Sequence, residues 1–321
     1  VNSPRVEVSG SVFESNAADG NGGALFIRSE SGAEFPIQIF DVTFEDNSAG
    51  IGGGGAHVAA TGDRIVEIWD VSFFTNDAAN GGGLEVEGLD PADPVFERVS
   101  WVTIDDFDFN DNIARSGNGG GADIAANDID IAIGGFVRNT ANSGSGAGLY
   151  VRRNILALDI VNTGFAWNVA GIDGGGFAVE SNDGPTIRFT NNTLFRNASI
   201  NRGAGGLLTV GGSMGLAQVY NNIIYGNTGA NVIGLDLYVD NDPFSDIPAL
   251  VNFFNNNITD LTGFPNSSAY FAIASSTELA AGNNRAGDPL LVDITEINPD
   301  PMQTQNSPTI DEGDDNAPGV P

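Results

Sequence analysis

The chain has 321 residues, no cysteine and a single histidine, His57, so His57 is the first side chain to consider for catalysis. Four more candidates hold comparable places in similar short segments: Glu85, Asp123, Tyr150 and Arg152. If these segments stack, Glu85 and Asp123 become direct neighbours, and two close carboxylates raise the pKa of one of them, which suits general acid–base catalysis. Carboxylates about 5–9 Å apart also serve glycoside hydrolysis. These five are the candidate catalytic residues.

Aligning the segments gives two rows of outward-facing positions. The first row reads Leu25, His57, Glu85, Asp123, Tyr150, Ala178, Leu208 and Asp236, and the second reads Ile27, Ala59, Glu87, Ala125, Arg152 and Glu180. A structural alternative stays open, because outward strand positions of an acidic protein are commonly polar without any catalytic role. The chain has no lysine, so Arg152, Arg153 or Arg188 would have to act as a base.

The elements that must position these side chains are repeats marked by asparagine. The marker asparagines are spaced by 31, 29, 36, 27, 29, 29, 30 and 30 residues, and three residues before each stands a large apolar residue, usually Phe. A period of this length is typical of repeat proteins, in which each unit buries its apolar face against its neighbours. The nine asparagines are Asn16, Asn47, Asn76, Asn112, Asn139, Asn168, Asn197, Asn227 and Asn257.

Each unit reads as three short strands. In IQIFDVTF, Ile37 and Ile39 alternate, a break follows at Asp41, and Val42 and Phe44 resume the alternation. The break residues are Gly10, Asp41, Asp70, Asp106, Ile133, Asn162, Asn191, Asn221 and Val251. Most of these are residues that tolerate the left-handed conformation of a tight bend. A glycine run then precedes a third strand, such as LEV or FAV.

This pattern predicts an all-β fold, a right-handed parallel β-helix of about ten coils with three short strands per coil. Period-2 alternation excludes a helical repeat, and a propeller blade would need four antiparallel strands. Rungs stack about 4.8 Å apart, so glycine lets the corner turn sharply with nothing to stack, and asparagine can form a ladder of amide hydrogen bonds. We expect a second, buried ladder of Asn192, Asn222 and Asn252 late in the stack.

Oxygen-rich loops are candidates for metal binding. Hard carboxylate ligands suit Ca²⁺, although neither group has EF-hand spacing, and solvated loop carboxylates remain the alternative. We expect no required cofactor, with Ca²⁺ as the one candidate ion. The candidate ligands are Asp105, Asp106, Asp108, Asp240, Asp242 and Asp246.

Composition limits the partners. With 42 acidic residues against 12 arginines, the chain has a formal charge of −30, which argues against nucleic acid or an anionic membrane as partner. The chain has no run of 18 apolar residues, so no membrane span is predicted. The first residue is not Met, so we expect a mature or trimmed chain. We divide it into a solenoid, residues 1–261, and an irregular closing segment, residues 262–321.

The repeats resemble those of the pectin-lyase-like superfamily of right-handed parallel β-helices. The GGAL and GGGL strands paired with Phe-x-x-Asn further resemble repeats of bacterial surface proteins such as the polymorphic outer-membrane proteins. This resemblance implies an extracellular or cell-surface location. In enzymes of the superfamily the substrate groove lies outside the third-strand face, which would place the five candidate residues beside it.

Three functions remain open from the sequence. The first is a structural or adhesive surface protein that binds copies of itself or a matrix polysaccharide. VEVSGSVF fits the repeat with no capping helix before it, so this rung can stack on another chain, or it can be covered by upstream sequence or by a short cap strand. The second is a polysaccharide lyase or glycoside hydrolase that uses the third-strand patch. The third is a stalk or passenger segment of a larger exported protein.

Overall fold

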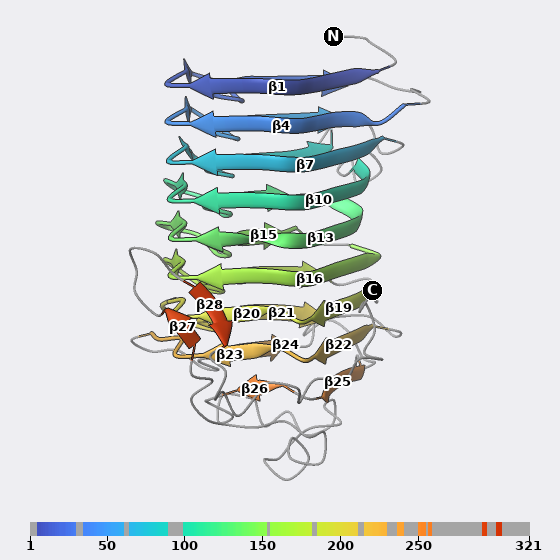
Figure 1. Cartoon of the computed structure of the whole chain (residues 1–321), viewed down its shortest axis with the longest axis vertical. Helices are drawn as coiled ribbons and strands as arrows, with labels where there is room; N and C mark the ends of the chain where they lie inside the picture. Colours follow the sequence, from blue (N-terminus) through green and yellow to red (C-terminus); the bar gives the residue numbers. More distant parts are fainter. Residues whose placement is uncertain are drawn as a thin grey trace.

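The computed structural model confirms the all-β class: the chain forms a parallel β-solenoid (Figure 1). The residues it describes are 5–29, 35–60, 64–88, 99–152, 155–181, 185–210, 215–229, 236–240, 250–254, 256–258, 291–293 and 300–303. Within these ranges the regular elements are strands, and no helix occurs. Accordingly, no helix of the described residues could span a membrane.

The strands form three parallel sheets that run along the rod. The first sheet stacks β1 (Val6–Glu14), β4 (Ile37–Glu45), β7 (Ile65–Phe74), β10 (Val99–Asn110), β13 (Ala126–Val137), β16 (Ala157–Ala166), β19 (Thr186–Thr190), β22 (Leu216–Tyr220) and β25 (Leu250–Phe254), with β20 (Thr193–Phe195), β23 (Ile223–Tyr225) and β26 (Asn257–Ile258) continuing the later rungs. The second sheet stacks β2 (Ala17–Ala18), β5 (Ser48–Ala49), β8 (Asp77–Ala78), β11 (Ile113–Ala114), β14 (Thr140–Ala141) and β17 (Val169–Ala170).

The third sheet carries the candidate site. It stacks β3 (Leu25–Ser29), β6 (Ala56–Ala60), β9 (Leu84–Gly88), β12 (Ala122–Ile124), β15 (Leu149–Val151), β18 (Phe177–Ser181), β21 (Gly206–Val210) and β24 (Leu237–Asp240). Further along the chain, β27 (Leu291–Asp293) pairs antiparallel with β28 (Asp300–Gln303). Most of the predicted closing segment, 262–321, lies outside the described residues.

The core lies inside the coils and is built from columns of like side chains. The phenylalanines three residues before the marker asparagines stack face to face, with ring centroids 4.6 Å apart between Phe44 and Phe73 and 4.5 Å between Phe73 and Phe109. Both the ring stacking and the removal of apolar surface from water stabilise the rod. Because the sheets are parallel and in register, one apolar residue per repeat is enough to make each column continuous.

The first sheet bends sharply at the predicted break residues. Eight of the nine predicted positions have positive φ angles, from 49° at Asp106 to 58° at Asn191. In the early rungs the strand runs through the bend without interruption, whereas from β19 and β20 onward it divides in two. Ile133 differs from the other bend residues in type: it is β-branched, and β-branched residues disfavour a positive φ such as the 54° found there.

The asparagine ladder forms at the next corner. Asn76 Nδ2 donates to Asn112 Oδ1 at 3.0 Å and to the carbonyl of Phe44 at 2.9 Å, and its backbone N–H also donates to Asn112 Oδ1. The same contacts repeat from rung to rung, so each buried amide is satisfied. The hydrogen-bonded column comprises Asn16, Asn47, Asn76, Asn112, Asn139, Asn168, Asn197 and Asn227.

The last predicted coil is out of phase with the structure. The ninth marker, Asn257, lies beside Ile223 instead of Asn227, and the Asn227 amide donates to Asp236. The second ladder continues from Asn222 to Asn256, so the prediction of Asn252 was wrong. This coil advances the register by 34 residues instead of 30, because four extra residues separate β22 from β25. The predicted bend at Val251 likewise falls inside β25, opposite Ala217.

Candidate functional site

The third sheet brings most of the predicted first row into one line. His57 on β6 lies beside Glu85 on β9, which lies beside Asp123 on β12, and Asp123 lies beside Tyr150 on β15. The ends of the row were misaligned by one or two residues. The observed row is Phe26, His57, Glu85, Asp123, Tyr150, Ala178, Leu207 and Tyr238.

The misalignment comes from the glycine runs. Position 25 pairs with Ala56, and Ile27 faces the core and is buried, so the second row begins at Arg28. At the other end, Gly206 takes the inward place that Phe177 holds in the preceding rung, which shifts the outward residue from Leu208 to Leu207. A glycine run carries no side-chain alternation, so it cannot fix the phase of the strand that follows.

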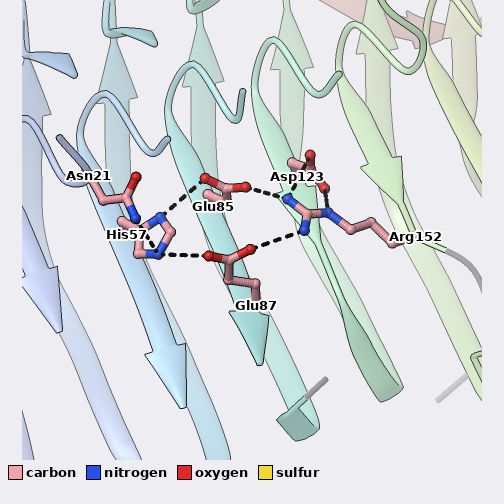
Figure 2. Close-up of polar contacts among 6 residues, drawn as sticks. All are labelled: Asn21, His57, Glu85, Glu87, Asp123 and Arg152. Atoms are coloured by element: carbon pink, nitrogen blue, oxygen red, sulfur yellow. Dashed lines mark hydrogen bonds and ion pairs between the residues drawn. The ribbon is translucent and has the colours of Figure 1, made fainter. Parts of the chain in front are cut away.

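His57 is held between two carboxylates of the next rung (Figure 2). Its Nδ1 lies 3.1 Å from Glu85 Oε2, and its Nε2 lies 3.3 Å from Glu87 Oε1. Glu85 and Glu87 are two residues apart on β9 and therefore point to the same face. With a carboxylate at each ring nitrogen, the imidazole is placed to donate both of its protons.

Arg152 closes the other side of the cluster. It follows β15, and its guanidinium contacts three carboxylates from two other rungs (Figure 2). Nε lies 2.7 Å from Asp123 Oδ1 and Nη1 lies 3.1 Å from Glu87 Oε2, and Nη2 contacts Glu85. Each glutamate thus uses one oxygen toward His57 and the other toward Arg152. We call His57, Glu85, Glu87, Asp123 and Arg152 the charged cluster.

The cluster is buried although it lies outside the core. His57 and Asp123 have side chains only 1% and 2% exposed, whereas Glu87 and Arg152 are 18% and 28% exposed. The glycine loop before β6 accounts for part of this burial: a Cβ atom at position 52 would lie 1.5 Å from Glu85 Oε2, and one at position 53 would lie 2.8 Å from His57 Cβ. Glycine in this loop therefore makes room for the cluster.

Burial and mutual contact shift the titration of the cluster. Desolvation alone would lower the pKa of His57, but hydrogen bonds and charge from Glu85 and Glu87 outweigh it and raise the pKa to about 8. Burial raises the pKa of Asp123 to about 6, against the opposing effect of Arg152. For Glu87, burial is outweighed by His57 and Arg152, and its pKa is lowered.

Tyr150, the fifth candidate, packs in a different group. It joins a small apolar cluster with Ala178, Leu207 and Tyr238 on the same face. Burial is the main reason that the pKa of its phenol is raised, and the charge of Glu180 raises it further. This places Tyr150 next to Asp123 in register but makes it a packing residue with a protonated hydroxyl.

The arrangement is suited to charge compensation and ion binding more than to substrate contact. A catalytic acid or base must reach the reacting atoms, and Glu85 and Asp123 are almost fully covered. His57, Glu85 and Glu87 each offer one ligand atom within 4.8 Å of the others, which is a set that could hold a metal ion. The cluster therefore consists of three carboxylates that contact one guanidinium, two of which also contact one imidazole.

The predicted calcium ligands are not gathered in the same way. Asp105, Asp106 and Asp108 lie on β10 around its bend and are exposed, and the pKa of Asp108 is raised, mainly by partial burial and then by Asp106. The Asp240 side chain, Asp242 and Asp246 lie outside the described residues. Calcium binding at either group stays a prediction.

Two residues of the site were not among the candidates. Glu87 stood in the second outward row, and its two-residue spacing from Glu85 was a usable signal that it shares the same face. Asn21, whose Nδ2 lies 3.4 Å from His57 Nε2, comes from the irregular loop before β3. Loop residues follow no alternation, so no sequence pattern pointed to Asn21.

The fold and site together define a parallel β-solenoid with a buried charged cluster on the outer side of its third sheet. Comparisons with models of protein families, with curated proteins and with solved structures found no match to this chain.

Proposed function

We propose that this protein is a structural or adhesive β-solenoid of the cell surface or extracellular matrix that extends by end-to-end stacking of its own copies. The observation that carries the proposal is the first described rung, which no other described residue covers on its outer edge. In the described part of the chain, β1, β2 and β3 are each the terminal strand of their sheet, and each therefore presents backbone groups along one free edge.

The core side chains of this rung would pack against another rung of the same kind. Val6, Val8 and Phe13 continue core columns but are only half-buried, while the equivalent Ile37, Ile39 and Phe44 one rung later are fully buried. Asn16 donates to Asn47, yet no described residue donates to the Oδ1 of Asn16. A further rung of the same kind would complete the Phe column and the asparagine ladder together.

Covering this rung removes apolar surface from water and satisfies open backbone groups, which favours association. The charge of −30 opposes it, so stacking requires salt that screens charges more than about 8–10 Å apart. A right-handed, pectin-lyase-like coil is part of this proposal, supported by the general preference for right-handed crossovers between parallel strands.

The test is the length of particles in solution and by electron microscopy at about 0.15 M salt. Val8→Asp places a charge in the half-buried core position of the first rung and should leave single-length rods, whereas the native chain forms longer rods as its concentration rises. Val12→Asp is the matched control, because Val12 is in the same strand but is 68% exposed and points outward. A native chain that stays single-length at high concentration would refute the stacking.

A carbohydrate-active enzyme is the second candidate, favoured by the adjacency of Glu85, Asp123 and Arg152. The burial of both carboxylates weighs against it. Incubation with a panel of acidic and neutral polysaccharides, assayed for reducing ends and unsaturated products, tests this function. Activity that disappears in a Glu85→Gln, Asp123→Asn double variant of intact fold would establish it over the structural role.

A further inference from the structure

We propose that the histidine end of the charged cluster is a binding site for one divalent transition-metal ion, with His57 Nε2, Glu87 and Asn21 as its ligands and Glu85 as the partner of Nδ1–H. This site is independent of the stacking proposed above. The donor set is one imidazole nitrogen, one carboxylate oxygen and one amide oxygen, which leaves the fourth position of a tetrahedral site to water. Imidazole with carboxylate favours Zn²⁺ or a similar ion, whereas Ca²⁺ and Mg²⁺ prefer oxygen ligands alone.

The distances fit a compact coordination sphere. Bonds of about 2.0–2.1 Å in a tetrahedral zinc site place neighbouring ligand atoms about 3.3–3.4 Å apart. His57 Nε2 lies 3.3 Å from Glu87 Oε1 and 3.4 Å from the Asn21 amide. Glu85 Oε2 lies 3.1 Å from His57 Nδ1 and accepts the proton of that nitrogen, which leaves Nε2 free to bind the ion.

Asn21 provides an independent sign of a missing partner. Its Oδ1 is buried and makes no hydrogen bond, while its Nδ2 faces a ring nitrogen of His57. Oxygen and nitrogen of an amide are exchanged by a half-turn that needs no other movement. That half-turn directs Oδ1 toward the space between His57 and Glu87, where a cation would be its partner.

The charge of the cluster also calls for a cation. Three carboxylates face Arg152 and His57, so the buried group keeps a net charge of −1 even with the imidazole protonated. Uncompensated buried charge is costly. A divalent ion bound to neutral His57 brings the total to zero, because two positive charges and that of Arg152 balance three negative ones.

The surroundings support binding and entry. Arg152 holds the second oxygen of both glutamates, as partners behind a metal ligand commonly do to fix its orientation. Glu87 and Arg152 are the partly exposed members of the cluster, so an ion can reach the site from their side. Because Gly52 has no Cβ atom, the Glu85 oxygen can occupy that place and contact His57 Nδ1.

The experiment is a calorimetric titration of Zn²⁺ into tag-free, chelator-treated full-length protein, with excess Ca²⁺ present to occupy weak carboxylate sites. We expect one tight equivalent of Zn²⁺. Substituting Co²⁺ should give the visible absorption of a four-coordinate site with a nitrogen ligand. Glu87→Gln should weaken Zn²⁺ binding by roughly 10- to 100-fold. Asn21→Ala should weaken it by a smaller factor, because it removes only the neutral ligand.

Glu180→Gln is the matched control. Glu180 holds the register position of Glu87 three rungs further along, and its substitution by Gln removes the same charge. Its tight equivalent should be unchanged. His57→Gln tests the nitrogen ligand, and circular dichroism confirms that each variant is folded. Absence of a tight equivalent in the native protein, or its persistence in Glu87→Gln, would overturn the proposal and leave the cluster as a metal-free ion-pair network.

Discussion

The asparagine ladder and the charged cluster are two buried polar regions built on opposite plans. The ladder repeats one neutral residue, and each Asn before Asn227 makes the same bonds to the next rung. The cluster uses a different side chain on each rung and is held by charge. Both are stacked at the same spacing and differ first in composition. The repeated Asn side chains satisfy one another, whereas the different charged side chains form a site whose state depends on protons and ions.

The difference also appears in where each region lies. The ladder lies at a corner where backbone carbonyls such as that of Phe73 accept the second amide hydrogen. The charged cluster lies outside the third sheet, where Glu87 and Arg152 reach solvent. Disrupting the ladder should therefore affect only the stability of the rod, whereas changes to the cluster should also alter its response to pH and ions.

Breaking the ladder should have the largest effect. Asn112→Ala removes the acceptor for the Asn76 backbone N–H and the donor to the Phe73 carbonyl, leaving buried groups unpaired. We expect a loss of about 4 kcal/mol in the free energy of unfolding, measured by denaturant titration. Asn16→Ala, at the exposed end of the same column, should cost less than about 1 kcal/mol. Equal losses for both variants would contradict the ladder as the source.

Removing the guanidinium should have the next largest effect. Arg152→Met keeps much of the side-chain volume but leaves Glu85 and Asp123 buried without their cation. Because Arg152 is 28% exposed, we expect a loss at the low end for a broken buried pair, about 3 kcal/mol. Arg115→Met, at the more exposed pair with Asp77, is the control and should change stability by less than about 1 kcal/mol. A larger loss of stability in Arg115→Met than in Arg152→Met would contradict this prediction.

The response to pH should be smaller. In metal-free protein the pKa of His57 rises from 6.5 unfolded to about 8 folded, so protonation stabilises the fold by about 2 kcal/mol. This contribution is fully present below pH 6.5 and is lost as the pH rises through 8. Thermal unfolding with a chelator should show this decline. In His57→Gln the decline between pH 6.5 and 8 should disappear; if it remains, another group causes it.

The smallest effect concerns the bend column, in which Ile133 is the mismatched member. Ile133 has a φ of 54° and is 56% exposed, so its β-branched side chain gains little from packing and strains the backbone. Ile133→Asn should stabilise the chain by about 1 kcal/mol in denaturant titration. The reverse change one rung later, Asn162→Ile, should destabilise it by a similar amount. If both substitutions stabilised the chain, the positive φ at the bend would not be the cause of the change in stability.

Repetition explains what could be predicted from the sequence. The class of fold, the bends and eight members of the ladder follow from a period that recurs until the coil before Asn257, because in-register stacking forces like positions into columns. The prediction failed where the period was interrupted. Four extra residues before β25 moved Asn256 into the column assigned to Asn252, and the spacing of 30 to Asn257 was coincidental.

The candidate site was predictable in position but not in environment. Alternation within the strands placed His57, Glu85 and Asp123 on one face, and the register brought them together. The burial of these three side chains could not be predicted from alternation, because irregular segments cover them, such as the loop around Gly52 and the loop that contains Asn21. Nor could the pattern reveal that Arg152 reaches back two rungs to Glu85, since a long side chain can lie in several directions.

The ladder also gives the rod an electrical direction. From Asn47 to Asn227, each carboxamide oxygen in it accepts from the rung on the β1 side, so the small C=O dipoles add along the axis as peptide dipoles do in an α-helix, although the second hydrogen of each amide returns to a carbonyl on the β1 side. The β1 end is then the negative pole of this column. If the rods stack as proposed, two β1 ends would oppose acceptor to acceptor, so copies would add in head-to-tail order and the fibre would have two chemically distinct tips.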